Sequence, residues 1–158
     1  GAPVLRDTLM DAGALCETLE TATDWSNVPR LKKAVGTALA SQLVGESAAL
    51  IMCHVSHVYA TGCSLYFTIV AGASEDNEST ARKWRAAKSA ATEAMTKNGG
   101  TVTHHHAVGT DHLPWMSEEI SPLGINILKA VKRELDPAGI LNPGKTFELP
   151  DNAERTLI

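Results

Sequence analysis

The hydrophobic positions change their period several times along the chain, and each change marks an expected element. Residues 15–22, LCETLETA, alternate between two sets of side chains, which is typical of a strand. A short helix over 5–10, ending near Gly13, is expected before it. After Pro29 an apolar residue recurs every four positions, which predicts a helix over about 28–44 with one buried stripe. That stripe contains Leu31, Val35, Leu39 and Leu43.

Residues 49–72 contain two apolar, β-branched and aromatic runs separated by YATG, which predicts a β-hairpin at the centre of a sheet. Side chains alternate between the faces of a strand. In the second run Leu65, Phe67 and Ile69 therefore share one face. Tyr66 lies on the more polar face, together with Ser64 and Thr68.

Helical periodicity returns over 77–98, where Asp76 or Ser74 is the expected cap and Gly99 the stop. Its inward residues are Trp84, Ala87, Ala91 and Met95. A short strand over 101–105 and a brief helix around 114–119 are expected next.

Ser121 and Pro122 then begin a final helix that ends at Asp136 and Pro137. Its expected inward residues are Ile127, Leu128, Val131 and Leu135. This element order predicts an α+β fold, an antiparallel sheet with helices packed mainly on one face. No repeat or linker divides the sequence, so residues 1–158 are expected to form one domain.

Composition narrows the function. The formal net charge is −4 and no Lys/Arg run occurs, which argues against nucleic acid as a partner. Three cysteines without a C-x-x-C pair favour a reducing, cytoplasmic location, and no apolar run approaches the roughly 20 residues of a membrane helix. The chain lacks an initiator methionine, which raises the possibility that it is a piece of a longer protein.

The chemistry-bearing stretch is GGTVTHHHAVGTDH, residues 99–112. In an extended segment His104 and His106 would point one way and His105 the other. The missing ligands of a zinc site would have to come from elsewhere without a spacing motif, so we expect no metal. A single histidine in a half-buried strand is most often hydrogen-bonded and silent, but three together indicate a polar cavity, and the flanking glycines would let a flat ligand approach.

Other candidates have competing structural explanations. Tyr66 either caps a core edge or transfers protons beside a histidine, and Tyr59 competes for that role. Arg6 would ordinarily be a solvated surface residue.

Four segments together resemble a known family: LRD…DAG…ETLETATDW, SHVYATGCSLYF, NGGTVTHHHAVG and ISPLGINILKAVKRELDPAGILNPGK. They resemble the C-terminal, cap-domain half of the FAD-linked oxidases of the vanillyl-alcohol-oxidase type. Within that family the chain is most similar to the alkyldihydroxyacetonephosphate synthases, flavoenzymes of ether-lipid synthesis. The DPAGILNPGK tail is shared widely, whereas the triple histidine with TGCSLYF is the narrower signal.

The resemblance implies FAD, held mainly by an N-terminal domain that is absent from this sequence, and a small-molecule or lipid-like substrate. It implies exchange of an acyl for an alkyl group through a flavin N5 adduct. By motif, Tyr66 corresponds to the acid/base tyrosine, and His104, His105 and His106 to the essential histidine run, with His106 also near the cofactor. Arg6 corresponds to the substrate-phosphate arginine, and Asn142 would lie near the flavin.

Two departures qualify the resemblance. Ala107 replaces an expected glycine, and GTDH replaces a more basic stretch, which weakens the case for a phosphorylated substrate. An FAD-dependent oxidase or dehydrogenase of a 2-hydroxy acid or other alcohol therefore stays open. So do a histidine-rich metal-binding module, a non-catalytic ligand-binding α+β module, a homodimer and peripheral membrane attachment.

Overall fold

The computed structural model describes residues 4–45 and 48–147. The chain divides into two compact units, Gly1–His106 and Ala107–Ile158, whereas the sequence suggested one folding unit.

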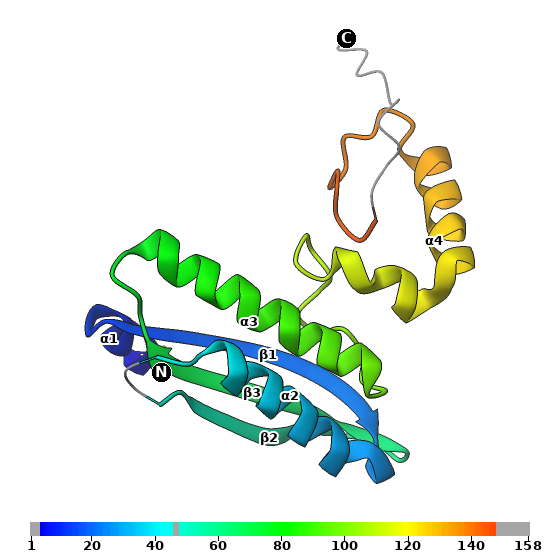
Figure 1. Ribbon diagram of the computed structural model, residues 1–158. Coiled ribbons are helices and arrows are strands. Elements are labelled where there is room, and N and C mark those ends of the chain that lie inside the picture. Colours follow the sequence, from blue (N-terminus) through cyan, green and yellow to red (C-terminus); the bar gives the residue numbers. More distant parts are fainter. Residues whose placement is uncertain (1–3, 46–47, 148–158) are drawn as a thin grey trace. The chain divides into compact units, whose positions relative to one another are not determined.

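The first unit contains a three-stranded antiparallel sheet in the order β1-β3-β2 (Figure 1). The strands are β1 (Ala14–Asp24), β2 (Leu50–Val58) and β3 (Gly62–Gly72). The strand expected over 15–22 and the expected hairpin are therefore confirmed. β3 pairs on both sides, so its side chains have neighbours on both β1 and β2.

Helices α2 (Val28–Gln42) and α3 (Asn77–Lys97) cover one face of this sheet, and the short α1 (Val4–Asp11) precedes β1 (Figure 1). The core lies between the two helices and that face. It contains Leu31, Val35, Leu39, Leu43, Leu65, Phe67, Ile69, Ala87, Ala91 and Met95. The stripes predicted for α2 and α3 and the α+β class are confirmed, because this core contains the periodic residues of both helices.

Local interactions determine where α3 begins and ends. At the start of α3 the Asp76 carboxylate accepts a hydrogen bond from the Ser79 backbone N–H at 2.7 Å. This bond and that from the Ser79 hydroxyl hold the pKa of Asp76 below its ordinary 3.8. After α3, Gly99 has a φ of +71°, a left-handed conformation that glycine adopts without strain.

The strand expected over 101–105 is wrong. The segment is not part of the sheet ladder, although the Thr101 N–H donates to the Ala22 carbonyl at 3.0 Å and the Thr21 hydroxyl to the Thr101 carbonyl at 2.7 Å. His105 and Ala107 have φ values of 60° and 61°, which an extended strand does not accommodate. The histidine run is therefore a bent segment tethered at the edge of β1.

Gly100 permits this tethering. A Cβ atom there would lie 2.7 Å from the Thr21 hydroxyl oxygen and 2.8 Å from a Leu31 methyl carbon. The sequence interpretation assigned this glycine to ligand approach. The structure instead uses it to pack the segment against the protein's own strand and helix.

In the second unit, a 3-10 turn (Leu113–Trp115) leads into α4 (Met116–Leu135). The two expected helices are joined there across a kink at Ser121, which has a φ of 66° and precedes Pro122. The expected inward residues Ile127, Leu128, Val131 and Leu135 are instead 38% to 75% exposed. No helix in the described ranges is long and apolar enough to cross a membrane.

The core predicts a test of the fold. Leu39→Ala removes a side chain that is 0% exposed and should lower the free energy of unfolding by about 3 kcal/mol, measured by urea denaturation. Leu5→Ala, at a position that is 71% exposed, is the matched control and should change it by less than about 0.5 kcal/mol. Equal losses in both variants would contradict this core assignment.

Candidate functional site

A buried carboxylate that sequence reasoning missed lies at the centre of the histidines. Glu20 on β1 is directly opposite Tyr66 on β3, and Tyr66 is opposite His54 on β2. Directly paired residues share a face of the sheet. Because Leu65 and Phe67 point into the helix-covered core, Glu20, Tyr66 and His54 lie on the other face.

Both carboxylate oxygens of Glu20 have polar neighbours, although the residue is only 4% exposed. Oε1 accepts a hydrogen bond from the Ser56 hydroxyl and lies 3.4 Å from His104 Nδ1 and 3.6 Å from His57 Nδ1. Oε2 lies 3.5 Å from His106 Nε2. One carboxylate thus gathers groups from β2 and from the histidine run.

These neighbours decide the charge of Glu20. Burial raises the pKa of its carboxyl, but hydrogen bonding from Ser56 and Ser64 and the proximity of His104 together lower it below the ordinary 4.5. Glu20 is therefore a carboxylate at neutral pH. A buried negative charge of this kind is tolerated only among partners, which here are hydroxyls and imidazoles.

The three histidines of the run differ in their contacts with Glu20. His104 and His106 both face it, as the expected alternation required, although the segment is not a strand. The His105 ring lies beside His104 and His57, with centroids 4.0 and 4.8 Å away.

The structure brings both candidate tyrosines to the histidine run. The Tyr66 ring lies 5.6 Å from that of His106 and 5.2 Å from that of His54, and its hydroxyl makes no hydrogen bond within the described residues. The Tyr59 hydroxyl is 2.8 Å from His104 Nε2. Tyr59 is therefore in direct hydrogen-bond contact with the run, which the sequence left open.

Arg6 is not joined to this cluster, and Asn142 lies in the other compact unit. Arg6 Nη2 lies 3.9 Å from Glu17, and Glu17 is paired with the core residue Ile69, so its side chain is on the face opposite Glu20. Asn142 belongs to the second unit, in the segment after α4, and has a φ of 45°.

Nitrogens of His57, His104 and His105 lie within 4.8 Å of one another. The sequence gave no spacing motif for this set, since His57 precedes the run by almost fifty positions. Imidazoles grouped in this way are able to ligate zinc after small side-chain movements.

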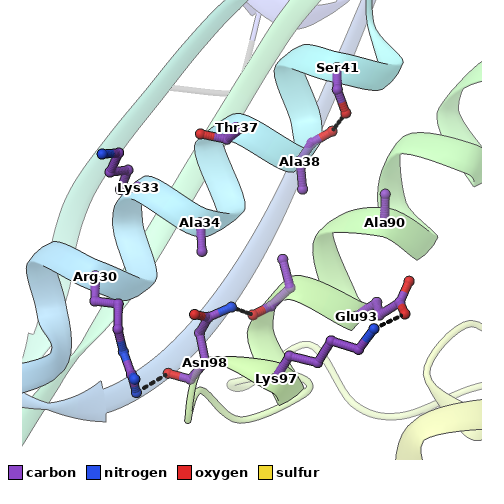
Figure 2. Close-up of a pocket in the computed structure, with 11 residues that line it drawn as sticks. Arg30, Lys33, Ala34, Thr37, Ala38, Ser41, Ala90, Glu93, Lys97 and Asn98 are labelled. Carbon is purple, nitrogen blue, oxygen red and sulfur yellow. Dashed lines mark hydrogen bonds and ion pairs between the residues drawn. The ribbon is translucent and has the colours of Figure 1, made fainter.

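A groove of about 580 Å³ lies elsewhere, between α2 and α3, as Figure 2 shows. Small residues of both helices line it together with polar pairs, such as Arg30 with the Asn98 carbonyl at 3.2 Å and Lys97 with Glu93. None of the histidines lines this groove, so it is separate from the Glu20 cluster.

Comparison with known proteins identifies the fold. Residues 1–146 match the family described as FAD linked oxidases, C-terminal domain. The chain belongs to this family.

This FAD-linked oxidase C-terminal domain is 32% identical over 155 residues to alkyldihydroxyacetonephosphate synthase of Trypanosoma brucei brucei, which covers 98% of the chain and 25% of that protein. A solved structure of alkyldihydroxyacetonephosphate synthase superposes with a TM-score of 0.61 at 28% identity, covering 91% of the chain and 23% of the other. A shorter match, 42% identical over 55 residues, is to glycolate oxidase subunit GlcD of Bacillus subtilis, covering 35% of the chain and 12% of that protein. The chain thus spans about a quarter of the synthase to which it is similar.

The family implies FAD, and the sheet face opposite the helices α2 and α3 fits the ring portion of such a cofactor. His106 is one-third exposed there, and Tyr66 presents a hydroxyl that no described residue satisfies. Flat rings and available hydrogen-bonding groups suit a planar, polar heterocycle.

Glu20 gives the domain a defined acid response. A carboxyl whose pKa is lowered by folding stabilises the fold above pH 4.5, and this contribution is lost as the pH falls through the folded-state pKa. We expect the free energy of unfolding to fall more steeply below pH 4.5 in the wild type than in Glu20→Gln, as measured by denaturation at a series of pH values. Glu93→Gln, in an exposed ion pair on α3, should keep the wild-type profile. Parallel profiles for the wild type and Glu20→Gln would contradict the assignment.

Proposed function

We propose that the chain is the cap, or substrate, domain of a larger flavoenzyme that exchanges the acyl group of an acyl-dihydroxyacetonephosphate for an alkyl group, as in ether-lipid synthesis. The observation that carries this proposal is the contact of Glu20 with the histidine run beside Tyr66, on the sheet face opposite the helices α2 and α3. The similarity to the synthase over almost the whole chain supports the same conclusion.

FAD, when bound, supplies the electron-rich centre at which the two groups exchange. Tyr66 and His106 would face the flavin ring, with the Tyr66 hydroxyl placed to exchange a proton with the substrate. His104 and His105 complete the polar wall of the site. The protons balance, because the fatty acid departs as a carboxylate and the one proton that the entering alcohol loses passes through the site to solvent.

The remaining site assignments have weaker support. Arg6 as the phosphate ligand and Asn142 as a flavin neighbour rest on the sequence resemblance, and the contact of Arg6 with Glu17 does not favour the phosphate role. We further propose a cytoplasmic location with peripheral membrane contact, which would give access to a lipid-like substrate, and assembly into a homodimer.

A second flavin activity has a specific observation in its favour. The local similarity to a glycolate oxidase subunit supports an oxidase or dehydrogenase acting on a 2-hydroxy acid or other alcohol. Both activities need a flavin and proton-transfer groups, so the cluster alone does not separate them.

Product analysis distinguishes the acyl-to-alkyl exchange from the oxidase or dehydrogenase activity. In a flavin-loaded protein that contains this chain, an acyl-dihydroxyacetonephosphate and a long-chain alcohol should give free fatty acid and alkyl product, without oxygen or dye consumption. Tyr66→Phe should lower kcat about 100-fold, because a proton-transfer group is lost. Lys33→Gln, on the helix layer, is the control and should leave kcat unchanged. Dye reduction by a hydroxy acid with no alkyl product would favour the oxidase instead.

The grouping of three histidines favours one further candidate, a metal-binding module. It predicts one zinc ion per chain in tag-free protein, measured by elemental analysis, and loss of that ion in both His57→Ala and His105→Ala. Substoichiometric zinc in the wild type would dismiss this candidate.

A further inference from the structure

Tyr59 and Tyr66 differ in what their hydroxyls contact. The Tyr59 hydroxyl lies 2.8 Å from His104 Nε2, with the rings edge to face, whereas Tyr66 meets histidines only through its ring within the described residues. Tyr59 is also 45% exposed, so part of this residue is open to solvent. A phenol with a base on one side and solvent access on the other has the geometry of a proton-transfer group.

Glu20 determines which nitrogen of His104 carries the proton. His104 Nδ1 is buried, makes no hydrogen bond of good geometry within the described residues, and lies 3.4 Å from Glu20 Oε1. A carboxylate at this position favours a proton on Nδ1. Nε2 is then left with its lone pair, so the Tyr59 hydroxyl donates and the imidazole accepts.

The backbone that carries Tyr59 is fixed by Trp25, which directly follows β1. Trp25 Nε1 donates to the Tyr59 carbonyl at 3.1 Å, and the Trp25 N–H donates to the Thr61 carbonyl at 3.2 Å. The Tyr59 N–H closes the hairpin onto the Gly62 carbonyl at 2.8 Å. These hydrogen bonds hold the turn that carries the Tyr59 phenol. Trp25, which makes two of them, directly follows the strand that carries Glu20.

We propose that Tyr59, His104 and Glu20 form a proton relay, in which Tyr59 exchanges a proton with the substrate while His104 and Glu20 are the positioning residues behind it. The proposal rests on the proposed function and adds a second phenol to it. In this arrangement the Tyr59 phenol is the reacting group, the His104 imidazole is its base, and the Glu20 carboxylate orients that base, as in catalytic triads.

The relay acts when the long-chain alcohol enters. The bond between the substrate carbon and the acyl oxygen breaks with its electron pair leaving on the carboxylate, and a bond from the alcohol oxygen to that carbon forms. The alcohol proton passes to the Tyr59 oxygen as the phenolic proton passes to His104 Nε2. The resulting imidazolium is stabilised by Glu20 and then releases the proton to solvent.

A first experiment tests the arrangement without catalysis. In the 158-residue chain labelled with ¹⁵N-histidine, at a pH where the ring is neutral, NMR should show the His104 proton on Nδ1. Glu20→Gln should weaken this preference, and Glu93→Gln should retain it. A proton on Nε2 in the wild type would overturn the relay.

A second experiment tests its use and does not depend on the folding of a Glu20 variant. In the flavin-loaded protein that contains this chain, Tyr59→Phe should lower kcat for alkyl exchange about 100-fold with KM nearly unchanged. Glu20→Gln should act in the same direction, and Glu20→Asp should recover part of the loss, while Glu93→Gln retains wild-type kcat. Full kcat in Tyr59→Phe would overturn the relay and leave the proposed function standing, whereas absence of alkyl product from the wild type would overturn both.

Discussion

The arrangement of the candidate site depends on one constraint, that a carboxylate removed from water needs polar partners. Glu20 meets this requirement with hydroxyls from β2 and β3 and with imidazoles on either side. Because its two oxygens point toward different histidines, the same charge orients His104 and His106 together. The bent histidine segment therefore has a defined side-chain arrangement without belonging to the sheet.

The sheet separates stability from chemistry by its two faces. The helix-covered face holds the apolar core, and the other face carries Glu20, Tyr66 and His54 in direct cross-strand register. Successive side chains of β3 point to opposite faces of the sheet, so Phe67 packs in the core while its neighbour Tyr66 contacts the histidines. A rigid core directly behind the polar face is what keeps such a site in position.

The histidine run connects two phenols of different character. The Tyr59 hydroxyl is hydrogen-bonded to an imidazole, whereas the Tyr66 hydroxyl makes no hydrogen bond within the described residues. In the proposed cap domain, the first is equipped to pass protons and the second to meet a bound ring or substrate. The FAD cofactor in this interpretation is inferred from the family. The different roles of Tyr59 and Tyr66 are inferred from their contacts within the domain.

The sequence by itself determined the helices, the three sheet strands, the covered face and the candidate histidines and Tyr66, because side-chain periodicity directly reports which face is buried. It did not find Glu20, since an alternating glutamate normally faces water, nor the bend at His105. It also placed the apolar stripe of α4 inward, where the structure leaves it exposed. Only the tertiary structure decided that Glu20, His104 and Tyr59 meet, because cross-strand register and the tether at Thr101 bring together residues up to 84 positions apart, and no local pattern encodes that.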